Sequence, residues 1–346
     1  MKNKLIYLLF GIAVVIAIII FATNRKSTLK KELRDFAYED TASINKIFMA
    51  DKNNNTLLLE RQGEIWIVNH KYMARKDAIK LLLETIATID VKSPVAKSML
   101  PRVTKLLATN SVKVEIYAND KRVKTYYVGD ATPDNMGTYM ILENSSMPFV
   151  MHKPGFNGYL TVRYFIDETD WRDLSLFPIS INKLYSIQIS STEQPAFSFT
   201  IIRKSPVDYV LLDMQNKPVS NYDTITVKEY ASTVIKLKAQ SWEIYIPPAR
   251  IDSIKQAVPF FQITIKTINE ENYNLKLYRH PNTHNQTDAQ GKLYPYDMDV
   301  MYGLLNNKDI VLCQYFVFDP ILVPINTFTE KRGNLVDKKM SLLINR

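Results

Sequence analysis

The chain has little glycine, a single cysteine and none of the short motifs that mark common enzyme classes. Its 346 residues include nine glycines and one cysteine. No Gly-x-Ser-x-Gly, His-Glu-x-x-His or Cys-x-x-Cys run occurs, so the usual signatures of α/β-hydrolases, zinc proteases and dithiol redox centres are missing. We therefore expect a protein that is not an enzyme, with no catalytic, cofactor-binding or metal-binding residues. Cys313 lies in the apolar run DIVLCQYFVF, where we expect a small buried side chain; the alternative is a reactive thiol.

The positive charge of the chain is concentrated at its ends. Of the formal net charge of +9, residues 1–35 contribute +5 and residues 327–346 contribute +3, which leaves residues 36–326 at +1. A nucleic-acid-binding domain needs its basic residues on the folded surface that meets the phosphates. The distribution therefore argues against a nucleic-acid partner and favours contact with lipid headgroups beside an apolar segment.

That apolar segment is LIYLLFGIAVVIAIIIFA, residues 5–22, which follows a short tail at 1–4 and contains no charged residue. At about 1.5 Å per residue, a helix of this length crosses most of the hydrocarbon core of a bilayer. No suitable small residue for signal cleavage and no cysteine for lipid attachment follows, so we favour an uncleaved transmembrane anchor over a cleaved signal peptide.

Two rules predict opposite orientations for this anchor. The flank after the segment is the more basic one, which by the positive-inside rule would keep the following domain in the cytoplasm. Long domains can translocate despite flanking charge, and a short Lys-bearing N-terminus before an apolar run is typical of exported proteins. We expect a single pass through the cytoplasmic (inner) membrane with the soluble part in the periplasm.

After a linker at 23–35, the chain predicts a sheet-and-helix unit over residues 36–175. SINKIFMA, NTLLLER and EIWIVN have the pattern of three strands, and the apolar residues of RKDAIKLLLETIATI recur at helical spacing. A second helical stretch over 93–109 contains Pro101, which we expect to kink or divide it. Four more strand-like runs follow: VKVEIYA, VKTYYVG, GTYMIL and MPFVMH.

The same order of patterns returns in a second unit over residues 176–326, before a basic tail at 327–346. NKLYSIQIS, AFSFTIIRK and DYVLLD precede a helical run at 224–238 with Asp223 as its N-cap. A short polar-apolar segment at 248–258 and four strand-like runs follow: FFQITIKTI, YNLKLYRH, DVMYGLLN and DIVLCQYFVF. The sequence thus predicts an α+β protein whose two related units of antiparallel sheet and helices arose by internal duplication.

Two of the nine glycines, Gly129 and Gly137, lie close together in VKTYYVGDATPDNMGTYM, residues 123–140. A phosphate-binding loop needs four residues between its glycines, a following lysine and a helix, whereas here seven residues separate the glycines and a strand-like run follows. Pro, Asp and Asn between two strand-like runs are typical of a turn. We therefore predict a hairpin loop.

This stretch, together with LLLERQGEIWIVN, KDAIKLLLETIATI and MPFVMHKPGFNGYL, resembles the bacterial family known as domain of unknown function 4340. The similarity is strongest from Ile44 to Trp171 and continues weakly through the second unit. The resemblance implies an envelope-associated protein with one N-terminal membrane segment, related to domains that accompany subunits of transport systems, including the auxiliary component linked to gliding motility. It implies no catalytic residue; Gly129, Gly137 and Tyr139 mark membership.

Two polar clusters are candidates for chemistry. HPNTH places His280 and His284 four residues apart, with Asp288 nearby, so a metal site in a loop is one hypothesis and a solvated loop the other. DETDWRD, from Asp167 to Asp173, gathers four acids around Trp171, as in sites where carboxylates flank a sugar stacked on an aromatic ring; the alternative is a solvated linker.

The leading functional hypothesis is a non-enzymatic, membrane-anchored envelope protein that acts as an accessory or scaffold component of a membrane assembly of the transport type. It would contact lipid through its N-terminal helix and a protein partner in the envelope. The alternative is a periplasmic glycan- or peptide-binding module that uses a cleft between the two units. A third hypothesis is a hydrolase built on Asp167, Asp170 or the two histidines. The sequence identifies no small-molecule ligand.

Overall fold

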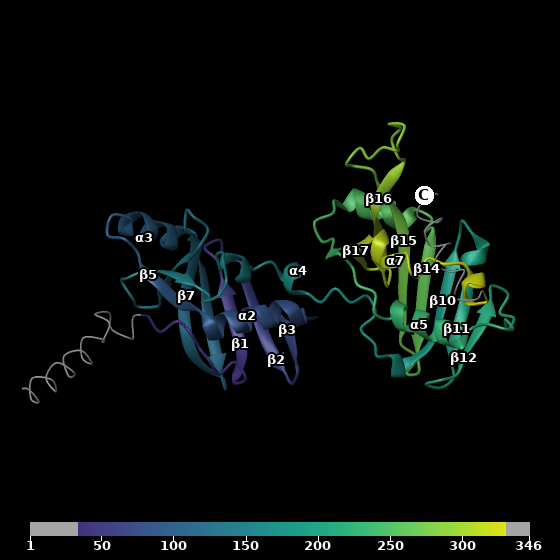
Figure 1. Ribbon diagram of the computed structural model, residues 1–346, viewed down its shortest axis with the longest axis horizontal. Coiled ribbons are helices and arrows are strands. Elements are labelled where there is room, and N and C mark those ends of the chain that lie inside the picture. The colour runs from purple at the N-terminus through teal and green to yellow at the C-terminus, as the bar shows by residue number, and fades with distance from the viewer. Residues whose placement is uncertain (1–33, 330–346) are drawn as a thin grey trace, which may run out of the picture. The chain divides into compact units, whose positions relative to one another are not determined.

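The computed structural model describes residues 34–329, which form seventeen strands and several short helices (Figure 1). The expected anchor at 5–22 and the residues beyond 329 lie outside this described part. Within 34–329, no helix has both the length and the apolar character needed to cross a bilayer. The chain divides into two compact units between Asp173 and Leu174, and each unit is described by itself below.

The first unit is built on one antiparallel sheet of nine strands, in the order β4-β3-β2-β1-β6-β7-β8-β9-β5. The strands are β1 (Ile44–Ala50), β2 (Thr56–Gln62), β3 (Ile65–Val68), β4 (Tyr72–Met73), β5 (Asp90–Pro94), β6 (Val112–Ala118), β7 (Lys121–Ala131), β8 (Thr138–Leu142) and β9 (Phe149–His152). Its helices are α2 (Lys76–Thr88), α3 (Leu100–Thr109) and the single turn α4 (Glu168–Trp171). This arrangement confirms the α+β class and the antiparallel sheet for the first unit.

Helices α2 and α3 cover opposite faces of this sheet. Ile79 and Leu82 of α2 belong to the same buried cluster as Met140 of β8, whereas Val103 of α3 packs in a separate cluster with Tyr139. Neighbouring residues of a strand point to opposite faces, so the two helices lie on the two sides. Each fully buried aliphatic side chain contributes about 1.5–3 kcal/mol, and the larger cluster, beneath α2, is the main core.

The second unit has an antiparallel sheet of eight strands, in the order β12-β11-β10-β14-β15-β16-β17-β13. The strands are β10 (Leu184–Ser191), β11 (Phe199–Arg203), β12 (Tyr209–Asp213), β13 (Ser241–Trp242), β14 (Phe261–Thr267), β15 (Asn272–Pro281), β16 (Tyr296–Leu305) and β17 (Asp309–Gln314). Helices α5 (Thr224–Val234), α6 (Pro248–Gln256) and the turn α7 (Tyr315–Phe318) accompany it. Val227 of α5 packs in the main cluster and Ile254 of α6 in a smaller one.

The two sheets share one topology. If β10–β12 are set against β1–β3, β13 against β5 and β14–β17 against β6–β9, the strand orders coincide, apart from β4 at the edge of the first sheet. The registers agree in detail, because β1 and β10 each carry an irregularity at the same point, between Ile44 and Lys46 and between Leu184 and Ser186. Equivalent positions of the two units can therefore be assigned by strand register.

Several local predictions were wrong at their boundaries. Pro101 lies in the first turn of α3 instead of kinking a longer helix, since proline in a first turn forgoes only an amide that has no helical partner. Residues 90–94, ahead of it, form β5, which the sequence patterns missed. The polar-apolar segment at 248–258 contains helix α6, and within the last strand-like run the strand β17 ends at Gln314 and α7 begins at Tyr315. The N-cap role of Asp223 is confirmed, because its side chain accepts a 2.9 Å hydrogen bond from the amide of Ile225.

Candidate functional sites

The glycine-containing loop at 126–140 is a hairpin between β7 and β8, as predicted. The amide of Thr132 donates to the carbonyl of Gly137 at 2.9 Å, and the Asp134 carboxylate accepts from the amide of Met136 at 3.1 Å. The two glycines permit close packing: a Cβ on Gly129 would lie 2.6 Å from Cδ2 of Leu107. Because the turn amides bond within the loop, the geometry is that of a structural turn.

Trp171 lies in the core, contrary to the hypothesis of an exposed sugar platform. Its side chain is fully buried, its ring stacks on Phe165 with centroids 4.3 Å apart, and its indole Nε1 donates to the carbonyl of Phe165 at 2.9 Å. A sugar cannot reach either face of a ring packed in this way. The sequence did not predict the burial of Trp171, because neighbouring acidic residues suggest an exposed segment. Its burial depends on contacts with residues distant in the chain.

The acids around Trp171 have local structural roles. The Asp167 side chain caps α4 by accepting from the amide of Thr169 at 2.9 Å, and Glu168 accepts from the side-chain amide of Asn69 at 2.7 Å. The guanidinium of Arg75 contacts the backbone carbonyl of Asp170 at 3.3 Å. The carboxylates of Asp167 and Glu168 therefore bond to neighbouring groups of the protein.

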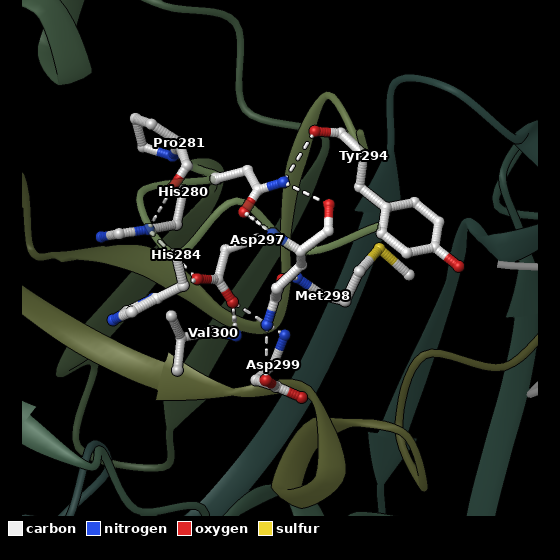
Figure 2. Close-up of polar contacts among 10 residues, drawn as sticks. His280, Pro281, His284, Tyr294, Asp297, Met298, Asp299 and Val300 are labelled. Atoms are coloured by element: carbon white, nitrogen blue, oxygen red, sulfur yellow. Dashed lines mark hydrogen bonds and ion pairs between the residues drawn. The ribbon is translucent and has the colours of Figure 1, made fainter. Parts of the chain in front are cut away.

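His280 and His284 do converge, but on Asp297 rather than on Asp288. Figure 2 shows both rings beside the Asp297 carboxylate, at the base of the loop between β15 and β16. The distances from Nδ1 to Asp297 Oδ2 are 3.4 Å for His284 and 3.9 Å for His280. Asp288 instead accepts from the amides of its own turn, including that of Lys292 at 2.9 Å. The sequence pointed to Asp288 because it is close along the chain. The acid that contacts both histidines is Asp297, which lies on the following strand β16.

The acceptor atoms in this cluster determine which ring nitrogens of the two histidines donate hydrogen bonds. Burial of Asp297 favours its neutral form, but hydrogen bonds from the amides of Asp299 and Val300 and from His284 outweigh this and lower the pKa of the carboxyl below 3.8. An ionised carboxylate only accepts hydrogen bonds, so Nδ1 of His284 donates to it. Nδ1 of His280 lies 2.8 Å from the carbonyl oxygen of Pro281, which likewise can only accept.

These Nδ1 atoms are thus occupied as donors and have no lone pair to offer a metal, whereas a donor bond at Nδ1 is compatible with a metal at Nε2 of the same ring. In the described range 34–329, no group of three or more His, Cys, Asp or Glu residues has the geometry to hold a metal ion. The rest of the cluster ties the loop together: the amide of Met298 donates to Gln286 Oε1 at 2.8 Å, and Gln286 Nε2 donates to Asp299 at 2.7 Å. These hydrogen bonds join the β15–β16 loop to the start of β16. The cluster of His280, His284, Gln286, Asp297 and Asp299 is called the latch below.

The single cysteine is a buried hydrophobic residue, as expected. Cys313 has no exposed surface, and burial raises the pKa of its thiol well above 9.0. A thiol held neutral in an apolar core is a poor nucleophile.

His70 also contacts an acid. It is exposed and lies 2.5 Å from Glu60, so it contributes a surface contact.

Unit 1 carries a groove of about 520 Å³ between α2 and strands β3 and β4. Its floor is apolar, formed by Trp66, Ile79, Leu83 and Ala87, and exposed Met73 lies at one side. Four charged side chains form the rim: Glu64, Lys76, Lys80 and Glu84. Sequence patterns did not indicate this groove, because its residues come from three separate elements.

A second hollow in the same unit, of about 420 Å³, is polar. Its lining includes Asp35, Arg122, Lys124 and Glu143, and these charges are paired with neighbours: Lys124 Nζ lies 2.6 Å from Asp35, and Arg122 lies 3.7 Å from Glu143. Paired charges leave little to bind a ligand. The groove beside α2 is therefore the better candidate for a binding site.

An arginine and an aromatic ring border the groove. The guanidinium of Arg61 lies 5.0 Å above the ring of Trp66, and it donates to the backbone carbonyls of Ala42 at 2.6 Å and Thr41 at 3.0 Å. These bonds join the segment before β1 to β2 and keep Thr41 at the edge of the groove. Arg61 thus contacts two residues that line the groove, Thr41 and Trp66.

The sequence profile of one family, described as Domain of unknown function (DUF4340), matches residues 66–257. The match covers more than half of the chain, and the protein belongs to this family, as its resemblance indicated. The matched range runs from β3 in the first unit through α6 in the second, so the family definition includes parts of both units. No curated protein and no solved structure matches the chain.

Proposed function

We propose that this protein is a non-enzymatic accessory component of a membrane assembly in the bacterial envelope, anchored by residues 5–22, with both units on the periplasmic side. It holds a protein partner rather than transforming a substrate. The observation that carries the proposal is the groove beside α2, with its apolar floor, because a surface of this kind is typical of a docking site.

Three features support this reading. The chain has an uncharged run of eighteen residues near its N-terminus, long enough to hold it at a membrane. The polar clusters that could suggest catalysis, around Asp297 and around Asp167, are occupied by bonds that stabilise a loop and a helix turn. The groove lies beside the edge of the first sheet formed by β4, whose two residues give a partner little room to add a strand there.

The experiment that tests the proposal is purification of the full-length protein from native membranes in mild detergent, with mass spectrometry of the accompanying proteins. We expect the same membrane-assembly subunits in repeated preparations, and their loss with the anchorless fragment 36–346. A full-length protein that is recovered alone in every preparation would overturn the accessory role.

The membrane orientation needs a separate test. An alkaline phosphatase fused to the C-terminus should be active, because this enzyme folds only in an oxidising compartment. A fusion to a reporter that functions only in the cytoplasm should be inactive. The opposite pair of results would place the two units in the cytoplasm and make the positive-inside rule the correct guide.

A further inference from the structure

We infer that the groove beside α2 binds a short segment of the partner protein through one or two aliphatic side chains. This inference rests on the proposed function, since the partner is a subunit of the same assembly. It goes further by naming the chemistry of the occupant and the residues that select it.

The first step is the equivalence of the two units around this position. Arg61 Nη1 donates to the carbonyl of Ala42, and Arg203 Nη1 donates to the carbonyl of Asn182 at 3.4 Å. By strand register, Arg203 takes the place of Arg61, and Asn182 that of Ala42. Tyr209, which pairs with Arg203, takes the place of Trp66, which pairs with Arg61. In both units, therefore, an arginine at the equivalent position bonds to the backbone of the segment before the first strand.

The second step is a difference in side-chain size at three equivalent positions. Three residues that line the groove in unit 1 are small: Thr41, Ala74 and Ala87. Counted from the equivalent first strands and from the N-caps Arg75 and Asp223, their counterparts in unit 2 are all large: Ile181, Tyr222 and Ile235. Other lining residues differ in the opposite direction: Trp66 corresponds to Tyr209, Ile79 to Val227 and Leu83 to Ala231.

The third step is what the large residues do in unit 2. Ile235 belongs to the main buried cluster, and Ile181 and Tyr222 pack against it. The hydroxyl of Tyr222 donates to the backbone carbonyl of Tyr209 at 2.6 Å, whereas in unit 1 the carbonyl of Trp66 accepts from the backbone amide of Ala74 at 2.7 Å. Unit 2 thus fills this place with its own aliphatic and aromatic side chains. Unit 1 leaves it open, and side chains of the same chemistry fit there.

The net charge of the groove's rim indicates which class of ligand the groove can bind. Two lysines, Lys76 and Lys80, and two acids, Glu64 and Glu84, border the groove, so the rim carries no net charge. Anionic lipid headgroups and nucleic acid need a basic surface, and this rim does not provide one. A polypeptide, with apolar side chains between polar backbone groups, matches an apolar floor with a mixed polar rim.

The test uses the full-length protein in its native membranes, with a photo-crosslinking benzophenone amino acid in place of Lys80 at the groove. The matched control carries the same probe in place of Lys228, the counterpart of Lys80 on α5, where unit 2 is filled. We expect a protein adduct from position 80 that position 228 does not give, with the cross-link in a segment of the partner that bears Ile, Leu or Val.

Filling the groove with the residues that unit 2 carries should remove the adduct. We expect the double variant Thr41→Ile/Ala87→Ile to lower the yield by about tenfold or more, since the partner loses the burial of at least one aliphatic side chain. Ala249→Ile, on the exposed face of α6, adds the same bulk elsewhere and should leave the yield unchanged. Met73→Glu places a charge at the side of the groove and gives an independent variant should the double variant fold poorly.

The outcomes separate this inference from the proposed function. Undiminished adduct in both groove variants, equal adducts from positions 80 and 228, or an adduct with the mass of an acyl chain would overturn the inference. If assembly subunits still accompany the protein in that case, the proposed function stands and only the site is wrong. If no subunit accompanies the full-length protein either, both fail.

Discussion

The backbone amide of Arg75 donates a 2.7 Å hydrogen bond to the carbonyl of Trp171, which joins the start of α2 to the last helical turn of the first unit. The second unit repeats this contact between Asp223 and Phe328 at 2.8 Å. In both units the aromatic side chain is fully buried. Each unit is thus closed by an aromatic residue beneath the N-terminus of its long helix, and the repeated contact supports an origin by duplication.

Truncation of the closing aromatic should strongly destabilise the first unit. We expect Trp171→Ala to lower the free energy of unfolding by about 3–5 kcal/mol, because it removes a large buried ring and leaves a cavity. Trp171→Phe, which installs the residue type found at position 328, should cost clearly less. Urea denaturation of the two variants measures both values. An unchanged midpoint for Trp171→Ala would contradict the burial described for this ring.

The arginine beside the groove should contribute more to stability than its counterpart in the second unit. Arg61 makes two hydrogen bonds to backbone carbonyls and lies over Trp66, whereas Arg203 makes one bond of 3.4 Å to Asn182 and has a buried Nε without a partner. We expect Arg61→Lys to cost about 1–3 kcal/mol and Arg203→Lys to cost less, because lysine cannot reproduce the planar fork. Equal losses in thermal denaturation would rule out this asymmetry.

Gly129 should tolerate no side chain. A Cβ at this position would lie 2.6 Å from Leu107 Cδ2 and 3.0 Å from the carbonyl oxygen of Tyr139, so we expect Gly129→Ala to cost about 1–3 kcal/mol through overpacking. The combination with Leu107→Ala should cost less than the sum of the two single losses, because the second change makes room for the methyl group. Strict additivity in the double-mutant cycle would show that the cost arises elsewhere.

The latch at Asp297 should make stability dependent on pH in the acidic range. The folded-state pKa of Asp297 lies below its ordinary value of 3.8, so its stabilising contribution is fully present above 3.8 and is lost as the pH falls below 3.8 through the lower folded-state pKa. We expect Asp297→Asn to cost about 1–3 kcal/mol at pH 7, since the amides of Asp299 and Val300 lose a charged acceptor.

The measurement is the unfolding midpoint of the wild type and of Asp297→Asn from pH 7 down to pH 3. Their difference should narrow as the wild-type carboxyl becomes protonated. Asp299→Asn is the control, because Asp299 is exposed and accepts one side-chain bond from Gln286. A difference that is constant across the pH range would exclude an ionised Asp297 as the source of the stability.

The sequence predicted most of the secondary structure, because alternation of apolar residues along a strand and their recurrence along a helix are local properties. It also predicted the β7–β8 hairpin, the Asp223 cap and family membership. It failed where the local signal was weak: the exposed edge strand β5 has no buried residue, and α6 has one, Ile254. A helix or strand with few buried residues shows little periodicity.

The candidate sites depended on long-range contacts. Asp297 meets His280 and His284 only because β16 returns beside β15, and Trp171 is buried by residues from distant parts of the chain. The groove combines Thr41, Ala74 and Ala87, whose small side chains are informative only by comparison with Ile181, Tyr222 and Ile235 in the second unit. The sequence by itself determined the elements and their repetition, since these follow from local periodicity. Which side chains meet, and which places stay unfilled, was decided by the tertiary structure, because packing brings together residues that no local pattern connects.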